Sequence, residues 1–229
     1  MGQGLELNGN MGFRNYWHAY AGGNIQTSVL ETGLLRGGPA MKTPGSFRTH
    51  MGFETDERKK LVFDISANIN KGFDNSSRGI YTEVEITLKP TNYLFFSLSP
   101  GISRSFEELQ YVTYREFNGS DRYIFASIDR KTINTSFRIN LNLSPDLTLQ
   151  YWGQPFIATG KYYDNKYILD PMAGDYHDRF SPYSDNQISL EDDLYKIDED
   201  ADGTTDYSFG KNDFNVQEFL SNLVVRWEY

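Results

Sequence analysis

One stretch, Ile133 to Ile157, constrains the fold of this chain more than any other feature of its sequence, because apolar and polar side chains alternate over eleven residues up to Leu143 and again after a turn. Its apolar members are Ile133, Thr135, Phe137, Ile139, Leu141 and Leu143, with Leu147, Leu149, Tyr151 and Ile157 resuming the register after a turn at Ser144–Asp146. Such alternation predicts two long strands in a hairpin, each with one apolar face. Strands of soluble proteins usually span about five or six residues, whereas amphipathic strands of about ten residues cross a bilayer in a barrel. The sequence therefore predicts an all-β fold, an antiparallel transmembrane β-barrel.

The same pattern recurs along the chain and predicts about nine strands within a single unit, residues 1–229. Short turns are expected near Gly22 (within Ala21–Asn24), Glu57, Pro90 and Pro145, and the longer connections, near Gly38, Asp74 and Glu108, at the opposite end. Alternation weakens over 103–122, which indicates either a long loop or a strand extension beyond the membrane. Because single-chain bacterial barrels have an even strand number, nine strands predict that this segment is part of a larger barrel.

The composition fits amphipathic membrane strands rather than membrane-spanning helices. Mean hydropathy is −0.57, yet 15% of residues are aromatic, as expected where tyrosine and tryptophan collect at membrane interfaces. No run approaches the roughly 18 apolar residues of a membrane helix. The net charge of −9 argues against nucleic-acid binding, and the absence of cysteine excludes thiolate catalysis and disulfides. No secretory signal is visible at Met1.

A long irregular acidic segment, residues 161–212, is predicted to be an extracellular loop, because barrels place their long loops on that side. It contains a calcium-loop pattern of carboxylates spaced around a turn glycine, Gly203. The predicted ligands of a Ca²⁺ ion are Asp198, Asp200, Asp202 and Asp206, with the carbonyl of Thr204. Phe209 stands where an EF-hand has its bidentate glutamate, so a looser calcium loop is the better comparison. The alternative is a solvated acidic loop without metal.

Charged residues at polar-parity positions are predicted to face the barrel lumen. They are Arg14, Arg48, Asp64, Glu83, Glu85, Arg138, Arg226 and Glu228. They could line a selective channel, or pair with one another and fill the interior; pairing is the favoured interpretation. The three histidines lack zinc-site spacing, no nucleophile elbow is present, and we predict no catalytic residues and no enzyme. Tyrosines of the acidic segment could stack on sugar rings, or pack on one another.

Several stretches carry a resemblance: Leu35–Met41, Tyr123–Thr132, Gln154–Ile157, Asp213–Phe219 and Ser221–Tyr229. In this order they resemble the C-terminal barrel of a large Bacteroidota outer-membrane family of unknown function, whose members carry an upstream domain similar to carbohydrate-binding module family 9. The resemblance implies the Gram-negative outer membrane as location and two further strands after Tyr229. It supplies no catalytic residues.

Three hypotheses follow. The leading one is a non-enzymatic outer-membrane barrel segment for transport or surface binding of glycan-related material, with membrane lipid or lipopolysaccharide, a glycan ligand and other outer-membrane proteins as partners. The second is a structural or assembly subunit of a larger outer-membrane complex. The third is a soluble β-sandwich or barrel binder, which requires the apolar rows to be buried in a core.

Overall fold

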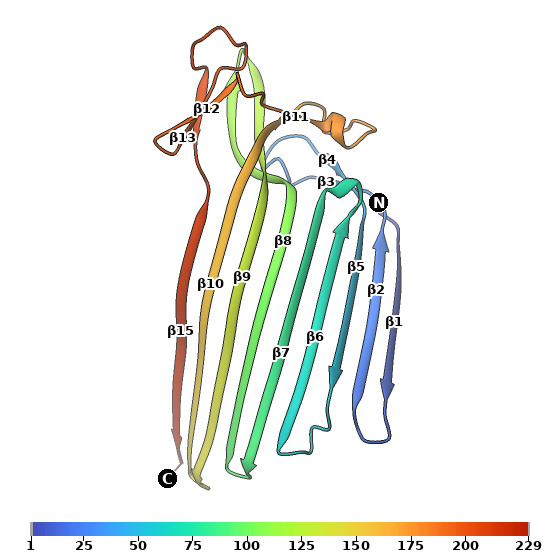
Figure 1. Ribbon diagram of the computed structural model, residues 1–229, viewed down its shortest axis with the longest axis vertical. Coiled ribbons are helices and arrows are strands. Elements are labelled where there is room, and N and C mark those ends of the chain that lie inside the picture. The colour runs from blue at the N-terminus through green and yellow to red at the C-terminus, as the bar shows by residue number, and fades with distance from the viewer. Residues whose placement is uncertain (1, 229) are drawn as a thin grey trace.

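The computed structural model describes residues 2–228 as an all-β structure dominated by one antiparallel sheet (Figure 1). Nine of its strands have nine or more residues: β1 (Gly4–Gly12), β2 (His18–Gln26), β5 (Ser46–Glu54), β6 (Leu61–Gly72), β7 (Ser77–Thr91), β8 (Leu94–Phe117), β9 (Ser120–Ser144), β10 (Leu147–Ile168) and β15 (Phe214–Trp227). The predicted all-β antiparallel class is confirmed, and the number of long strands agrees with the prediction. Among the described strands, β1 pairs only with β2, and β15 only with β10. No described helix is long and apolar enough to cross a membrane.

One predicted turn, at Ala21–Asn24, is wrong. These residues lie inside β2, and the chain reverses instead at Phe13–Trp17, where the amide of Tyr16 donates to the carbonyl of Phe13 at 2.9 Å. A Cβ atom at Gly22 would overlap the side chains of Asn8 and His50 on the neighbouring strands. The glycine is therefore used for close cross-strand approach and not for a turn.

Residues 103–122 form a strand extension and not a loop. β8 and β9 continue together as a long hairpin that ends at Asn118 and Gly119, which both have positive φ. Such a pair is the preferred two-residue turn of a hairpin. The register shifts between Glu107 and Gln110 and again between Tyr111 and Thr113, so the strand bends as it leaves the main sheet.

The acidic segment 161–212 is more regular than the sequence indicated. β10 continues to Ile168, and the rest holds the 3-10 helix η2 (His177–Arg179) and four short strands. These are β11 (Phe180–Pro182), β12 (Ile188–Glu191), β13 (Leu194–Ile197) and β14 (Tyr207–Gly210); the last three form their own sheet. Pairings of only three or four residues between polar turns leave too little periodicity for a sequence to reveal. The connection between β2 and β5 similarly contains β3 (Val29–Glu31) and β4 (Met41–Thr43), and η1 (Phe73–Asn75) joins β6 to β7.

Two hydrophobic clusters lie in a structure that we call the cap, made of residues 27–45, 108–127 and 161–213 at one end of the sheet (Figure 1). The first cluster comprises Leu35, Met41, Phe125, Ile168, Tyr176 and Phe180. The second comprises Ile124, Tyr183, Ile197, Tyr207 and Phe209. Short turns connect the strands at the other end. The cap is thus packed in the manner of a small globular domain.

The rest of the main sheet, which we call the wall, is a single layer with two unlike faces. Directly paired residues share a face, so the register defines each row. One row, through seven strands, is Ala21, Met51, Ala67, Thr82, Ile102, Ile133 and Ile157, and the next row, on the other face, is Gly22, His50, Asn68, Tyr81, Ser103, Thr132 and Ala158. Large side chains of the first face are exposed, among them Leu5, Leu7, Met11, Ile25, Phe47, Met51, Leu61, Phe63, Ile65, Ile69, Ile80, Leu88, Ile102, Ile133, Leu143, Ile157, Phe219, Leu223 and Val225. No second layer of the described residues covers this apolar face (Figure 1).

Besides Gly160, which lies under the ring of Phe214, two glycines of the wall are covered by aromatic rings. Phe137 lies across from Gly153, and Tyr20 lies across from Gly52. A Cβ atom at either glycine would overlap the ring opposite. Each ring therefore occupies space that only a glycine leaves free on the neighbouring strand.

Candidate functional site

The polar face of the wall carries most of the charges that the sequence placed in the lumen. Arg48, Asp64, Glu83, Glu85, Arg138 and Arg226 share this face by register. Asp64 is directly opposite Glu85 on one side and Glu54 on the other. The hydroxyl of Tyr81 donates to Glu83, and that of Thr87 donates to Glu85 at 3.2 Å. The face therefore concentrates carboxylates on β5, β6 and β7.

The structure does not pair most of these charges with one another, although pairing was the favoured interpretation of the sequence. Within residues 2–228 only Arg226 has a predicted partner, Glu228, at 2.5 Å, and both side chains are well exposed. Asp64, Glu83 and Glu85 make no ion pair with a described cation. Arg14 is off the face altogether, since it lies in the turn that replaces the one predicted at Ala21–Asn24. The register places carboxylates, and no cation, directly opposite Asp64, so a shared face alone does not pair these charges.

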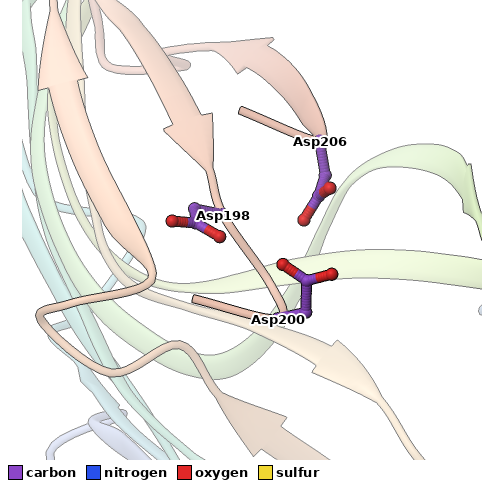
Figure 2. Close-up of side chains that lie close together, drawn as sticks. All are labelled: Asp198, Asp200 and Asp206. Carbon is purple, nitrogen blue, oxygen red and sulfur yellow. The ribbon is translucent and has the colours of Figure 1, made fainter. Parts of the chain in front are cut away.

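The acidic loop between β13 and β14 brings three of the five predicted calcium ligands together. Asp198, Asp200 and Asp206 each place a carboxylate oxygen within 4.8 Å of the others, and Figure 2 shows these carboxylates around a common space. The backbone is fixed at both ends of the loop, since the amide of Asp198 donates to the carbonyl of Gln187 at 2.9 Å and that of Asp206 to the carbonyl of Ile197 at 2.8 Å. Oxygen ligands in this arrangement suit a hard divalent cation.

The fourth predicted carboxylate, Asp202, is hydrogen-bonded to Thr204, whose own predicted ligand atom, the carbonyl oxygen, takes no part in these bonds. One carboxylate oxygen of Asp202 accepts hydrogen bonds from the amide and the hydroxyl of Thr204, at 2.8 and 2.6 Å. These bonds lower the pKa of Asp202. Loss of solvent and then the charges of Asp202 and Asp206 raise the pKa of Asp200, so the three grouped carboxylates repel one another. The spacing of the motif identified the loop, while the local Asx turn decided which members converge.

Glu199, inside the same motif, anchors the loop to the strand extension and was not recognised in the sequence. Arg122 on β9 donates to its carboxylate at 2.7 Å, and both side chains are largely buried. The hydroxyl of Tyr207 donates to the same carboxylate, and the side-chain amide of Gln187 donates to the backbone carbonyl of Glu199 at 2.6 Å. Burial, with the bond to Glu199, raises the pKa of Tyr207, so that its hydroxyl stays protonated. Nothing in the run of acidic residues distinguishes this carboxylate from its neighbours.

Two buried cations, neither of which was predicted from the sequence, hold the other cap segments. Lys166 places its ammonium 3.0 Å from the Ser127 hydroxyl, beside the carboxylate of Glu108. Arg179 donates to the backbone carbonyls of Lys42 at 2.9 Å, Ala173 at 3.0 Å and Gly174 at 3.2 Å. The cap is therefore a specified structure in which segments far apart in the sequence are tied together by charge.

The tyrosines of the cap serve mainly as its core. Tyr176 and Tyr183 are buried, and the hydroxyl groups of Tyr183 and Tyr207 lie 2.9 Å apart. Tyr167 and Tyr195 pack against the second cluster. Packing on one another, rather than presentation to a sugar, accounts for most of these rings.

These features define a class: an antiparallel all-β protein with a single-layer amphipathic wall and a packed cap at one end. The chain belongs to the family described as Domain of unknown function (DUF5916), which matches residues 2–199. No curated protein and no solved structure matched the chain.

Proposed function

We propose that this chain forms part of the wall of an outer-membrane β-barrel, with the cap outside the cell and the short turns in the periplasm. The uncovered apolar face of the wall carries this proposal. Burying a fully exposed large apolar side chain is worth about 1.5–3 kcal/mol. Roughly twenty of them, each about half exposed in water, therefore forgo about 15–30 kcal/mol. That reaches or exceeds the typical net stability of a domain, about 5–15 kcal/mol, and a bilayer supplies the missing apolar environment.

The location and orientation are supported by the asymmetry of the two ends. Bacterial barrels have short periplasmic turns and long outer loops, and the cap gathers the long connections at one end (Figure 1). The resemblance to a Bacteroidota outer-membrane family supports the Gram-negative location and the glycan-related role. Membrane lipid and lipopolysaccharide are the partners of the apolar face in this proposal.

Within this role, we favour non-enzymatic transport over surface binding of glycan-related material. The cap tyrosines are used in packing, whereas the polar face presents Asp64, Glu83 and Glu85 without described cationic partners. Rings of carboxylates along a pore select cations. The test is conductance of the intact protein in planar bilayers, where cation selectivity is expected.

Two double variants that remove the same charge are compared. One is Glu83→Gln with Glu85→Gln on the polar face, and the control is Glu107→Gln with Glu116→Gln at the cap end. The first pair is expected to move the reversal potential toward zero, and the second to leave it in place. A protein that conducts nothing and binds no sugar on a glycan array would contradict both halves of the role.

We also propose that Asp198, Asp200 and Asp206 bind Ca²⁺ and stiffen the cap. The support is the convergence of three carboxylates whose mutual repulsion a divalent cation would relieve. Extracellular calcium modules work at about 0.1–1 mM. Isothermal titration calorimetry with calcium tests the site, with the Asp200→Asn variant as the comparison.

The second candidate function, an assembly subunit of an outer-membrane complex, is favoured by the edges of the sheet. β1 and β15 each leave one side unpaired among the described strands, and unpaired backbone groups cost several kcal/mol each in lipid. Strands of another chain would satisfy them. Cysteine cross-linking from Asn8 and from Asn222 in native membranes distinguishes the two functions: cross-links to a different protein favour assembly, and cross-links within one chain favour a self-contained transporter.

A further inference from the structure

Four cations form a cluster on the apolar face of the wall, next to the cap. They are Lys71 on β6, Arg78 on β7, Arg104 on β8 and Lys131 on β9, and we call them the basic cluster. Lys71 is directly opposite Arg78, and Arg104 is directly opposite Lys131. Arg78 and Arg104 are diagonal neighbours, because their partners in the register are Phe106 and Ile80. The cluster is thus continuous over four adjacent strands.

Each cation stands next to an exposed isoleucine on the same face. The isoleucine is two residues away along the strand, on the side remote from the cap: Ile69, Ile80, Ile102 and Ile133. Two residues of a strand span about 6.6 Å. The apolar face therefore ends in a row of isoleucines, and a row of cations follows one step further out.

This arrangement is unfavourable without a counter-charge. Like charges directly opposite in a sheet destabilise it, and two such pairs occur side by side. None of the four cations makes an ion pair within residues 2–228. The guanidinium of Arg78 lies 5.0 Å from the centre of the Phe106 ring, and that contact leaves its charge unneutralised.

The cluster lines a surface groove of about 990 Å³. The carboxylates of the groove compensate this charge only in part. Glu108 is paired with Lys166, and Arg130 is paired with Glu107. That leaves two lining carboxylates, Asp164 and Asp129, against the four cations of the basic cluster. The hydroxyl of Tyr163 donates to Asp129 at 3.1 Å and leaves its charge unchanged. The groove has the size of a ligand site and a net positive charge.

Resting on the proposed membrane location, we propose that the basic cluster binds the phosphate groups of an anionic glycolipid headgroup in the leaflet at the cap end. In the Gram-negative outer membrane this lipid is lipopolysaccharide, through its phosphorylated lipid A. Arginine holds phosphate by paired charge-assisted hydrogen bonds, and the isoleucines below contact the acyl chains of the same molecule. A phosphate between the opposed cations removes their repulsion.

The experiment measures binding of three probes to the detergent-purified chain by native mass spectrometry and by calorimetry. The probes are diphosphoryl lipid A, dephosphorylated lipid A with the same acyl chains, and inorganic phosphate. We expect diphosphoryl lipid A to bind at least about tenfold more tightly than the other two, since hydrogen bonds to charged groups contribute about a factor of ten or more each. Binding should weaken with salt.

The decisive variant is Arg78→Gln with Arg104→Gln, for which we expect the phosphate preference to fall at least about tenfold. Lys59→Gln with Lys60→Gln, at the opposite end of the wall, removes the same charge and should change nothing. Arg78→Lys with Arg104→Lys keeps both charges but loses the paired hydrogen bonds, so its preference should lie between those of the unchanged chain and the glutamine variant. Binding by this variant also shows that the wall folds with altered side chains here. Equal binding of both lipids, equal binding of free phosphate, or an unaffected glutamine variant would overturn the proposal.

Failure of this inference is distinct from failure of the proposed function. A chain that inserts into neutral phosphatidylcholine vesicles but shows no phosphate preference remains a membrane wall without a lipid A site. A chain that stays in water without detergent contradicts both.

Discussion

A charge placed on the apolar face of the wall should cost far more than the same charge one residue further along the strand. Ile65 is the central apolar position of β6 and is 46% exposed. An arginine facing lipid at mid-membrane costs about 2–4 kcal/mol, which is a roughly thirtyfold to thousandfold change in the folding equilibrium. Ser66 lies on the polar face directly opposite Glu83, so Ser66→Arg gains a favourable cross-strand charge and should change the free energy of unfolding by less than about 1 kcal/mol.

The measurement is urea unfolding of each variant after folding into lipid vesicles, followed by tryptophan fluorescence. The same pair also tests the alternative of a soluble protein. In water, a substitution at a half-exposed position typically changes stability by about 0.5 kcal/mol or less. Equal stability of Ile65→Arg and Ser66→Arg would therefore refute the assignment of this face to lipid.

Three further predictions concern the cap and the turns. Calcium should protect the chain against protease cleavage between Tyr195 and Phe209, EDTA should remove this protection, and Asp200→Asn should abolish it. Protection should also decrease as the pH is lowered, because the ligands must be deprotonated to bind the ion. Identical cleavage rates in all conditions would show that the segment is a solvated loop without metal. Arg122→Ala strands the largely buried carboxylate of Glu199 and should destabilise the cap by about 3–5 kcal/mol, seen as faster cleavage of the same loop, whereas Arg115→Ala, which loses bonds to uncharged groups alone, should cost less. Hydrogen bonds from Arg58 lower the pKa of Asp56 to about 2. The stabilisation from these bonds is therefore complete above about pH 4 and is lost as the pH falls through about 2. Asp56→Asn should flatten this part of the curve of stability against pH, and an unchanged curve would count against a stabilising role of the Arg58–Asp56 pair.

The wall could be predicted from the sequence because its fold depends on a local period. Alternation such as Ile133 to Leu143 sets the face of each residue whatever its partner strand is. The turn wrongly predicted at Ala21–Asn24 shows the limit of a prediction from local pattern. A glycine such as Gly22 can serve in a turn or, as here, allow the side chains of Asn8 and His50 to approach the backbone. Only the positions of neighbouring strands distinguish the two uses.

The cap could not be predicted, because it depends on contacts between distant residues. Arg122 and Glu199 are separated by 77 positions, and Arg179 reaches a carbonyl 137 positions away. The calcium motif located three grouped carboxylates, but the hydrogen bonds that turn Asp202 toward Thr204 follow from the folded turn. The basic cluster could not be predicted for the same reason, because its four members come from four different strands.

The rings that lie over glycines bear on how such a wall avoids mispairing. Shifting one strand by two residues keeps every side chain on its proper face, so amphipathicity does not penalise that error. The same shift would move Phe137 from Gly153 to Tyr151 or Pro155, where the vacant space is gone. Phe137 over Gly153 and Tyr20 over Gly52 therefore favour one strand alignment among those that keep every side chain on its proper face.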